Sequence, residues 1–180
     1  QWQIEAVEKN AKAAVHHESI IDLTKSIDII KSKFRKSYRS LINENKYGIR
    51  CRIVGKDINP NIWDESRELH KREAGRGTRS DETWEIQYQI IVEGGGFLST
   101  VRDENQNMIG CGFFEITRDE AQYSSAAYRR DLFRLPIGHI AQFKAINEMQ
   151  KRGCKEYYIG RYSTLHDEQR PSDKELAISH

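Results

Sequence analysis

The chain has 180 residues, of which 31% are charged, and its formal net charge is +2 at pH 7. A chain of this length can bury a hydrophobic core as one domain without disulfides or a structural metal. The near-neutral balance does not require a nucleic acid or an anionic membrane as partner. No window approaches the roughly 18 uncharged apolar residues of a membrane span, and the first residues are no secretory signal, so we expect a cytoplasmic protein.

Cysteine and histidine patterns do not indicate a metal site. Cys51, Cys111 and Cys154 are far apart and lie in expected strands. They lack the short paired spacing of zinc ligands, so buried thiols are the expected role. The six histidines also show no ligand spacing on one helical face. We therefore expect no metal.

The first 45 residues are expected to form a helical segment ahead of a domain over 46–180. Apolar residues recur at steps of three and four over 1–17, which predicts an amphipathic helix. A short apolar piece over 19–23 is compatible with a strand. A second helix is expected over 26–45, with four residues on its buried stripe: Ile27, Ile30, Phe34 and Leu41. Its other face is basic and either binds phosphate groups of RNA or a lipid or is simply solvated; it carries Lys31, Lys33, Arg35, Lys36 and Arg39.

A strand over 50–54 is followed by two expected helices. Asn59 and Pro60 supply an N-cap and a first-turn proline for a helix that ends at Gly75. Asp81 lies in the acidic first turn of the next helix, which stops at the glycines from Gly94 onward.

The loop between these helices contains two glycines and two arginines, Arg76 and Arg79. Glycines let a backbone approach a ligand, and arginine offers a fork of donors to phosphate or carboxylate. The loop is therefore a candidate anion-binding segment. The alternative is that Gly75 is only a helix C-cap and both arginines are solvated.

A three-strand meander is expected next, over 97–102, 108–116 and 121–128. The second strand is apolar on both faces, which indicates a central position. Its Gly110 and Gly112 indicate a bend or a close approach by another group. The third strand has small side chains that leave room for an extended ligand.

A long amphipathic helix is expected over 137–152 and a buried strand over 155–160. Gly138 lies in the first helical turn, where free N–H groups and the helix dipole favour an anion, and Arg134 lies just upstream. The structural alternative is that Gly138 lets the helix approach the strand at Gly110 and Gly112. Further on, Ser172 and Glu175 have capping-box spacing for a last helix.

From residue 20 to the end, the chain resembles the GNAT acyltransferase superfamily, and in detail its Fem branch, which adds amino acids to peptidoglycan precursors. The resemblance rests on the order of elements and on four segments: 33–42, 136–141, 152–160 and 171–175. It implies an α/β fold with a mixed, largely antiparallel sheet flanked by helices, and further strands after the last helix, which this sequence lacks. Of the GNAT pyrophosphate motif only Gly138 matches, with Leu135 and Ile140 at the outer positions. The implied donor is therefore either acyl-CoA or aminoacyl-tRNA.

The resemblance also implies direct attack by an amine or hydroxyl of a cell-envelope or saccharide precursor on the carrier-bound acyl group. It places an oxyanion donor on the third strand near Ser125 and Ala126. Tyr158 or Tyr162 would protonate the leaving group, and His139 is a candidate base or a packing residue, with Asp131 and His166 as weaker candidates. The candidate binding residues for the donor are Arg134, Gly138, His139, Ser125 and Ala126. Arg76 and Arg79 of the basic loop are expected to bind either the acceptor or the donor phosphate, and Arg161 is a further candidate for substrate binding.

A non-catalytic alternative remains open at this point. The same fold could hold RNA through the basic segment around Arg35 and the loop around Arg76. Strongly salt-dependent RNA binding without transferase activity is the result that this alternative predicts.

Overall fold

The computed structural model describes residues 17–162, with side chains described as far as Gly160. Residues Ile20–Ile159 form one compact unit, and the fold is described within it; the strand ends at 17–19 and 160–162 belong to a second unit. The helix expected over the first sixteen residues and the capping box at 172–175 lie outside the described residues.

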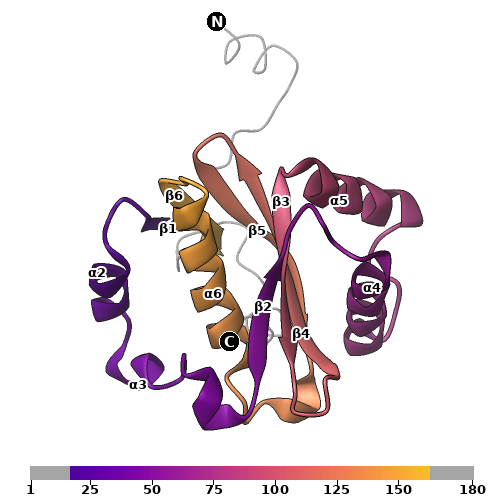
Figure 1. Ribbon diagram of the computed structural model, residues 1–180, viewed down its shortest axis with the longest axis horizontal. Coiled ribbons are helices and arrows are strands. Elements are labelled where there is room, and N and C mark those ends of the chain that lie inside the picture. The colour runs from indigo at the N-terminus through magenta and orange to yellow at the C-terminus, as the bar shows by residue number, and fades with distance from the viewer. Residues whose placement is uncertain (1–16, 163–180) are drawn as a thin grey trace, which may run out of the picture. The chain divides into compact units, whose positions relative to one another are not determined.

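Six strands form one mixed sheet in the order β1-β6-β5-β4-β3-β2. Strands β2 to β5 form an antiparallel meander, and β6 joins β5 in parallel. This confirms the mixed, largely antiparallel sheet predicted from the resemblance (Figure 1). The strands are β1 (His17–Asp22), β2 (Arg50–Val54), β3 (Gly96–Arg102), β4 (Met108–Thr117), β5 (Glu120–Tyr128) and β6 (Glu156–Tyr162).

Helices cover both faces of the sheet. Helices α4 (Pro60–Ala74) and α5 (Asp81–Glu93) lie on one face, where Trp63 and Trp84 pack against Phe113 and its neighbours. Helix α6 (Ile137–Lys151) covers the other face together with α2 (Ile27–Ser32) (Figure 1). The central strand β4 is buried through its first seven residues, as its apolar sequence predicts. None of the described helices is both long and apolar enough to cross a membrane.

The helix ends follow the capping signals in the sequence. The Asn59 side chain accepts from the N–H of Asn61 at 2.9 Å, and the Ser80 side chain accepts from the N–H of Thr83 at 3.2 Å. Gly75 ends α4 in the left-handed conformation with φ of +67°, which favours glycine. These caps confirm the predicted limits of α4 and α5.

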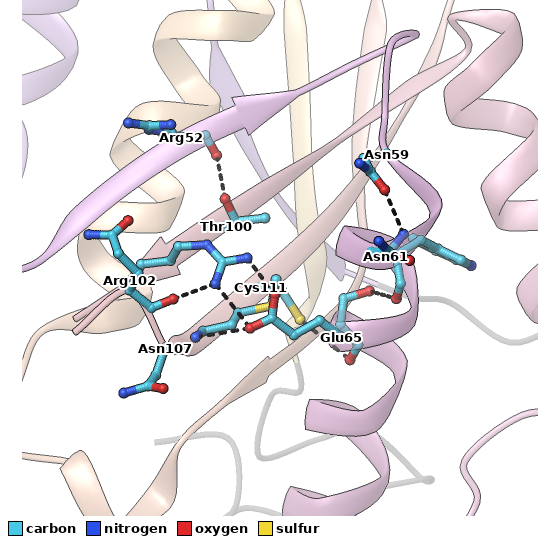
Figure 2. A network of polar contacts seen from close by, with 12 residues as sticks. Arg52, Asn59, Asn61, Glu65, Thr100, Arg102, Asn107 and Cys111 are labelled. Carbon is cyan, nitrogen blue, oxygen red and sulfur yellow. Dashed lines mark hydrogen bonds and ion pairs between the residues drawn. The ribbon is translucent and has the colours of Figure 1, made fainter. Parts of the chain in front are cut away.

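An ion pair fixes α4 on the edge of the meander. Glu65 of α4 accepts from the Arg102 guanidinium, with Nη1 at 3.0 Å, and from the backbone N–H of Met108 at 3.2 Å (Figure 2). Arg102 also donates to the carbonyl of Gln106 at 2.6 Å, so the turn between β3 and β4 is held by the same group. This anchor sets the position of α4 over β4 and β5.

The expected single helix over 26–45 is wrong. The segment forms α2, the short helix α3 (Lys36–Arg39) and a 3₁₀ turn at Glu44–Tyr47. Side chains compete for its backbone carbonyls: Ser32 Oγ donates to the Ile29 carbonyl at 2.7 Å, and Arg39 donates to the carbonyls of Ser32 and Phe34. Of the predicted stripe, Ile30 is buried and the other three residues are half-buried. The basic residues of this segment therefore do not lie along one continuous helix, as the RNA alternative assumes.

Candidate functional site

The pairing between β5 and β6 stops early. The two strands pair at three positions, the last of which joins Gln122 to Tyr158. Strand β5 continues to Tyr128, and no described strand pairs with residues 123–128 on this side. We call this stretch the open edge of β5. Backbone polar groups along such an edge are available to a ligand.

The register with β4 shows which backbone groups face the open edge. The Arg129 N–H donates to the Ile109 carbonyl at 2.9 Å, so the backbone polar groups of Arg129 point toward β4. Successive residues of an antiparallel strand point their N–H and C=O groups to alternate sides. Ala127 and Ser125 therefore also face β4, whereas Tyr128 and Ala126 present their backbone groups to the open edge.

A β-bulge lies at the start of this edge. Phe113 pairs with Ser125 and Phe114 pairs with Tyr123, which leaves Ser124 as the extra residue of β5. The hydroxyl of Ser124 donates to Glu115 at 2.6 Å. The buried hydroxyl of Ser125 has no hydrogen-bond partner among the described residues. A buried polar atom without a partner is costly, and a bound ligand is one way to satisfy it.

The N-terminus of α6 lies beside the open edge. No side chain caps this helix, and its first backbone hydrogen bond runs from Ile140 to Pro136, so the N–H groups of Gly138 and His139 precede that bond. A Cβ atom at Gly138 would lie 3.4 Å from the Tyr128 ring, which is ordinary contact. Together with the exposed Arg134, these groups form a physically reasonable anion site.

The close approach of α6 to the sheet depends on Gly110. A Cβ atom there would lie 2.4 Å from Cγ2 of Ile137 and 2.8 Å from Cδ1 of Tyr128. The sequence alternative, that Gly138 permits this approach, therefore finds little support, because Gly138 has ordinary contact distances. Gly110 is the position at which a side chain does not fit.

The candidate catalytic side chains lie in different surroundings. Tyr158 occupies the last paired position of β6, and its hydroxyl donates to Glu156 Oε2 at 2.7 Å. The exposed His139 ring makes an edge contact with Tyr38, with ring centroids 4.7 Å apart, and partial burial lowers its pKa. This contact favours the packing role for His139.

Of four further candidates, only Asp131 has a described side chain. Asp131 is paired with Arg129, which lowers the pKa of its carboxyl group and makes it a poor base. The side chains of Arg161 and Tyr162, and all of His166, lie outside the described part of the chain.

The two arginines of the loop between α4 and α5 differ. Arg76 is exposed, whereas Arg79 is half-buried with its guanidinium 5.2 Å from the Trp84 ring centre. Trp84 also contacts the buried ring of His70, with centroids 5.1 Å apart. Burial, with the Arg79 charge as second cause, lowers the pKa of His70 to about 4, so the imidazole is neutral at pH 7. The sequence reasoning missed His70, although a histidine four residues before the end of an amphipathic helix and next to Leu69 indicates burial.

Sequence comparison gives no relative: no family model matches the chain, and no curated protein matches it. Solved structures with the same fold do exist. L-PGS from Bacillus licheniformis matches with a TM-score of 0.66 and 12% identity over 99% of this chain and 55% of that chain. FemX matches with a TM-score of 0.66 and 12% identity over 93% and 59%. An aminoglycoside acetyltransferase from an uncultured soil metagenomic sample gives 0.56 and 12% over 76% and 88%.

The chain thus spans a little over half the length of L-PGS and of FemX. At 12% identity these likenesses concern the fold alone. They confirm the fold that the resemblance stated from the sequence implied. The chain has the fold of the GNAT superfamily, and FemX is among its structural relatives.

Proposed function

We propose that the protein is an acyl- or aminoacyltransferase that moves an acyl group from a phosphate-bearing carrier to an amine or hydroxyl. The observation that carries the proposal is the open edge of β5 beside the uncapped N-terminus of α6. The open edge of β5 offers hydrogen bonds to an extended ligand chain, and the N-terminus of α6 offers N–H groups to phosphate. Both lie in a fold shared with acyl-transferring proteins.

Acyl-CoA and aminoacyl-tRNA both fit this description of the donor. Phosphate oxygens would lie against the N–H groups of Gly138 and His139, with Arg134 supplying charge. The acyl-bearing end would extend along β5, where Ala126 and Tyr128 present free backbone groups. The Ser125 hydroxyl, which has no hydrogen-bond partner among the described residues, would satisfy its hydrogen-bonding capacity with the acceptor.

The proposed reaction assigns a role to each of these groups. The acceptor nitrogen or oxygen attacks the carbonyl carbon, and the Ala126 N–H donates to the oxyanion that forms. The bond between carbonyl carbon and the carrier sulfur or oxygen then breaks. Tyr158 donates its proton to that leaving atom, and the attacking group loses one proton, with His139 as the remaining candidate to receive it.

The acceptor is proposed to belong to a cell-envelope or saccharide precursor and to approach from the side of α4 and α5. Arg79, held over Trp84, offers a fixed guanidinium to an acidic group of the acceptor, and Arg76 and Arg161 are the further candidates. The names of FemX and of the aminoglycoside acetyltransferase motivate this class of acceptor.

The test combines donor identification with one variant. Purified protein is incubated with acetyl-CoA or with aminoacylated tRNA and a panel of amine acceptors, and transfer is followed by mass spectrometry. We expect transfer from one donor type, reduced about 100-fold or more in kcat in Tyr158→Phe. Absence of transfer from both donors, together with absence of binding to either, would refute the proposal.

A further inference from the structure

Phe133 is the most exposed large apolar side chain in the described part of the chain. Its ring is 81% exposed, and no other large apolar side chain among the described residues exceeds the 55% of Ile86. Single exposed apolar side chains are common on folded proteins, so exposure alone does not indicate a binding surface. The conformation and the charges around Phe133 distinguish it from the others.

The turn that carries Phe133 is fixed by backbone hydrogen bonds. Phe133 follows the 3₁₀ helix η2 (Arg130–Leu132), where the Leu132 N–H donates to the Arg129 carbonyl at 3.2 Å. The Leu135 N–H then donates to the Leu132 carbonyl at 2.8 Å. Leu132 and Leu135 pack against a buried cluster of the core, whereas Phe133 does not. A folded turn therefore presents Phe133 to the outside.

Helix α4 also contacts this turn. Glu73 of α4 accepts from the Arg130 N–H at 3.0 Å, and its other oxygen accepts from the Arg72 side chain at 3.2 Å. Within the turn, Arg129 and Asp131 form an ion pair. A surface that is already ordered loses little conformational entropy when it binds a partner. The turn is thus preorganised for binding.

Two arginines beside Phe133 leave an unbalanced positive charge. Arg130 and Arg134 are exposed, and neither forms an ion pair with a described residue. The neighbouring carboxylates, Glu73 and Asp131, are already paired with other arginines. Arg130 lies three residues before Phe133, and side chains three residues apart in a 3₁₀ turn share a face. The exposed ring and a free positive charge therefore lie on the same side of the turn.

Ile86 on α5 is the next most exposed apolar side chain and lacks these surroundings. Its neighbours at steps of four and three along the helix are Glu82 and Gln89, both exposed. A carboxylate and an amide give no attraction to an anionic surface. An exposed apolar ring next to unpaired arginines is therefore a particular property of the turn at Phe133.

This combination fits the chemistry of an anionic lipid surface. At such a surface an apolar ring enters the boundary between headgroups and acyl chains, while arginine side chains remain at the level of the lipid phosphates. A nucleic acid fits less well. A nucleobase stacks on a ring that the protein supports from behind, and at 81% exposure the Phe133 ring has little such support.

We infer that the turn around Phe133 docks the protein on an anionic lipid surface, with the ring at the headgroup boundary and with Arg130 and Arg134 at lipid phosphates. One ring and two arginines give weak, reversible binding, which concentrates a protein at a surface without anchoring it. The inference concerns a surface outside the open edge of β5, and it does not depend on the proposed transfer reaction.

Vesicle flotation tests the inference. Purified protein is mixed with vesicles of phosphatidylcholine, either alone or with added phosphatidylserine, and the bound fraction gives a partition coefficient. We expect the wild type to bind the vesicles with phosphatidylserine about tenfold or more tightly than the neutral ones. Raising the salt concentration should remove most of this difference.

Three variants assign the binding to the turn. Phe133→Ser should lower the partition coefficient about tenfold and leave the melting temperature unchanged, because the ring buries little surface. Arg130→Gln should lower binding to the phosphatidylserine vesicles about fivefold and leave binding to neutral vesicles unchanged. Ile86→Ser is the matched control, and we expect it to bind both kinds of vesicle as the wild type does. Arg134 is kept because it also belongs to the proposed phosphate site.

Phe133→Trp reports directly on the position of residue 133. Trp63 and Trp84 are buried, and subtracting the wild-type spectrum removes the emission of all native tryptophans. We expect the added tryptophan to emit at shorter wavelength on phosphatidylserine vesicles and to be quenched by brominated lipid.

Three results overturn the inference: wild-type protein that does not bind phosphatidylserine vesicles, equal binding by Phe133→Ser and the wild type, or vesicle-bound Phe133→Trp with unshifted emission. Two parallel measurements identify another partner. RNA binding that Phe133→Ser weakens, without vesicle binding, would assign the turn to a nucleic acid. A dimer that Phe133→Ser dissociates in sedimentation, without vesicle binding, would assign the turn to a second copy of the chain.

Discussion

Replacing Gly110 with alanine should destabilise the protein because α6 is packed directly against this position. The added Cβ would meet Cγ2 of Ile137 at 2.4 Å and the Tyr128 ring at 2.8 Å. Real Cβ atoms do not occur at such distances, so the first turn of α6 or the strand must shift. Overpacking of this kind costs about 1 to 3 kcal/mol of unfolding free energy. For a domain of this size that corresponds to a fall in melting temperature of roughly 2 to 12 °C.

Gly138→Ala is the matched comparison. Its Cβ would lie 3.4 Å from the Tyr128 ring, and alanine is the better helix former. We expect its melting temperature to equal or slightly exceed that of the wild type. Gly138→Val carries two further methyl groups toward the same ring, so we expect it to weaken donor binding with a modest loss of stability.

Thermal melts and urea unfolding of the three variants, with donor titration on each, test the reasoning. The decisive comparison is between the two alanine variants. If Gly138→Ala lost more stability than Gly110→Ala, the helix would approach the sheet differently from the structure. If Gly138→Val melted lower but bound donor as well as wild type does, Gly138 would have no part in a phosphate site.

Five other substitutions provide four further tests. Tyr158→Phe should lower kcat with little change in KM. A rise in KM with unchanged kcat would exclude the proton-donor role. Arg79→Ala should raise the acceptor KM more than Arg76→Ala does, because only the former guanidinium is held in place; equal effects would contradict this. His70 has a folded pKa of about 4 against 6.5 unfolded, so the unfolded state binds more protons between these values. The unfolding free energy therefore decreases as the pH is lowered through this range, by at most about 1.4 kcal/mol per pH unit. Urea unfolding of His70→Gln at pH 7 and 4.5 should show a smaller fall than wild type. As the proposed proton acceptor, His139 should be required for the acidic limb of the pH profile of kcat/KM, and an unchanged profile in His139→Gln would leave it only its packing contact with Tyr38.

The sequence predicts the elements from β2 onward well, because their ends depend on local chemistry. Asn59, Pro60 and Gly75 define α4 by capping groups that act within one turn. The meander follows from apolar alternation and polar turns in the same local way. The segment over 26–45 is different, since its apolar stripe has helical spacing while Ser32 and Arg39 bind backbone carbonyls that a continuous helix would use. Periodicity reports which residues share a face, and it does not report this competition.

In the candidate site, too, the sequence predicts the local features and misses those that depend on residues far apart in the chain. Gly138 and Arg134 could be proposed from the sequence because a helix N-terminus is a local feature. The early end of the β5 and β6 pairing is set by residues more than thirty positions apart, and no local pattern encodes it. One signal was nevertheless present: Gln142 lies four residues after Gly138 on the inward face of an otherwise apolar helix stripe. A glutamine on this face needs a hydrogen-bond partner, and it has one in the hydroxyl of the buried Tyr157 of β6.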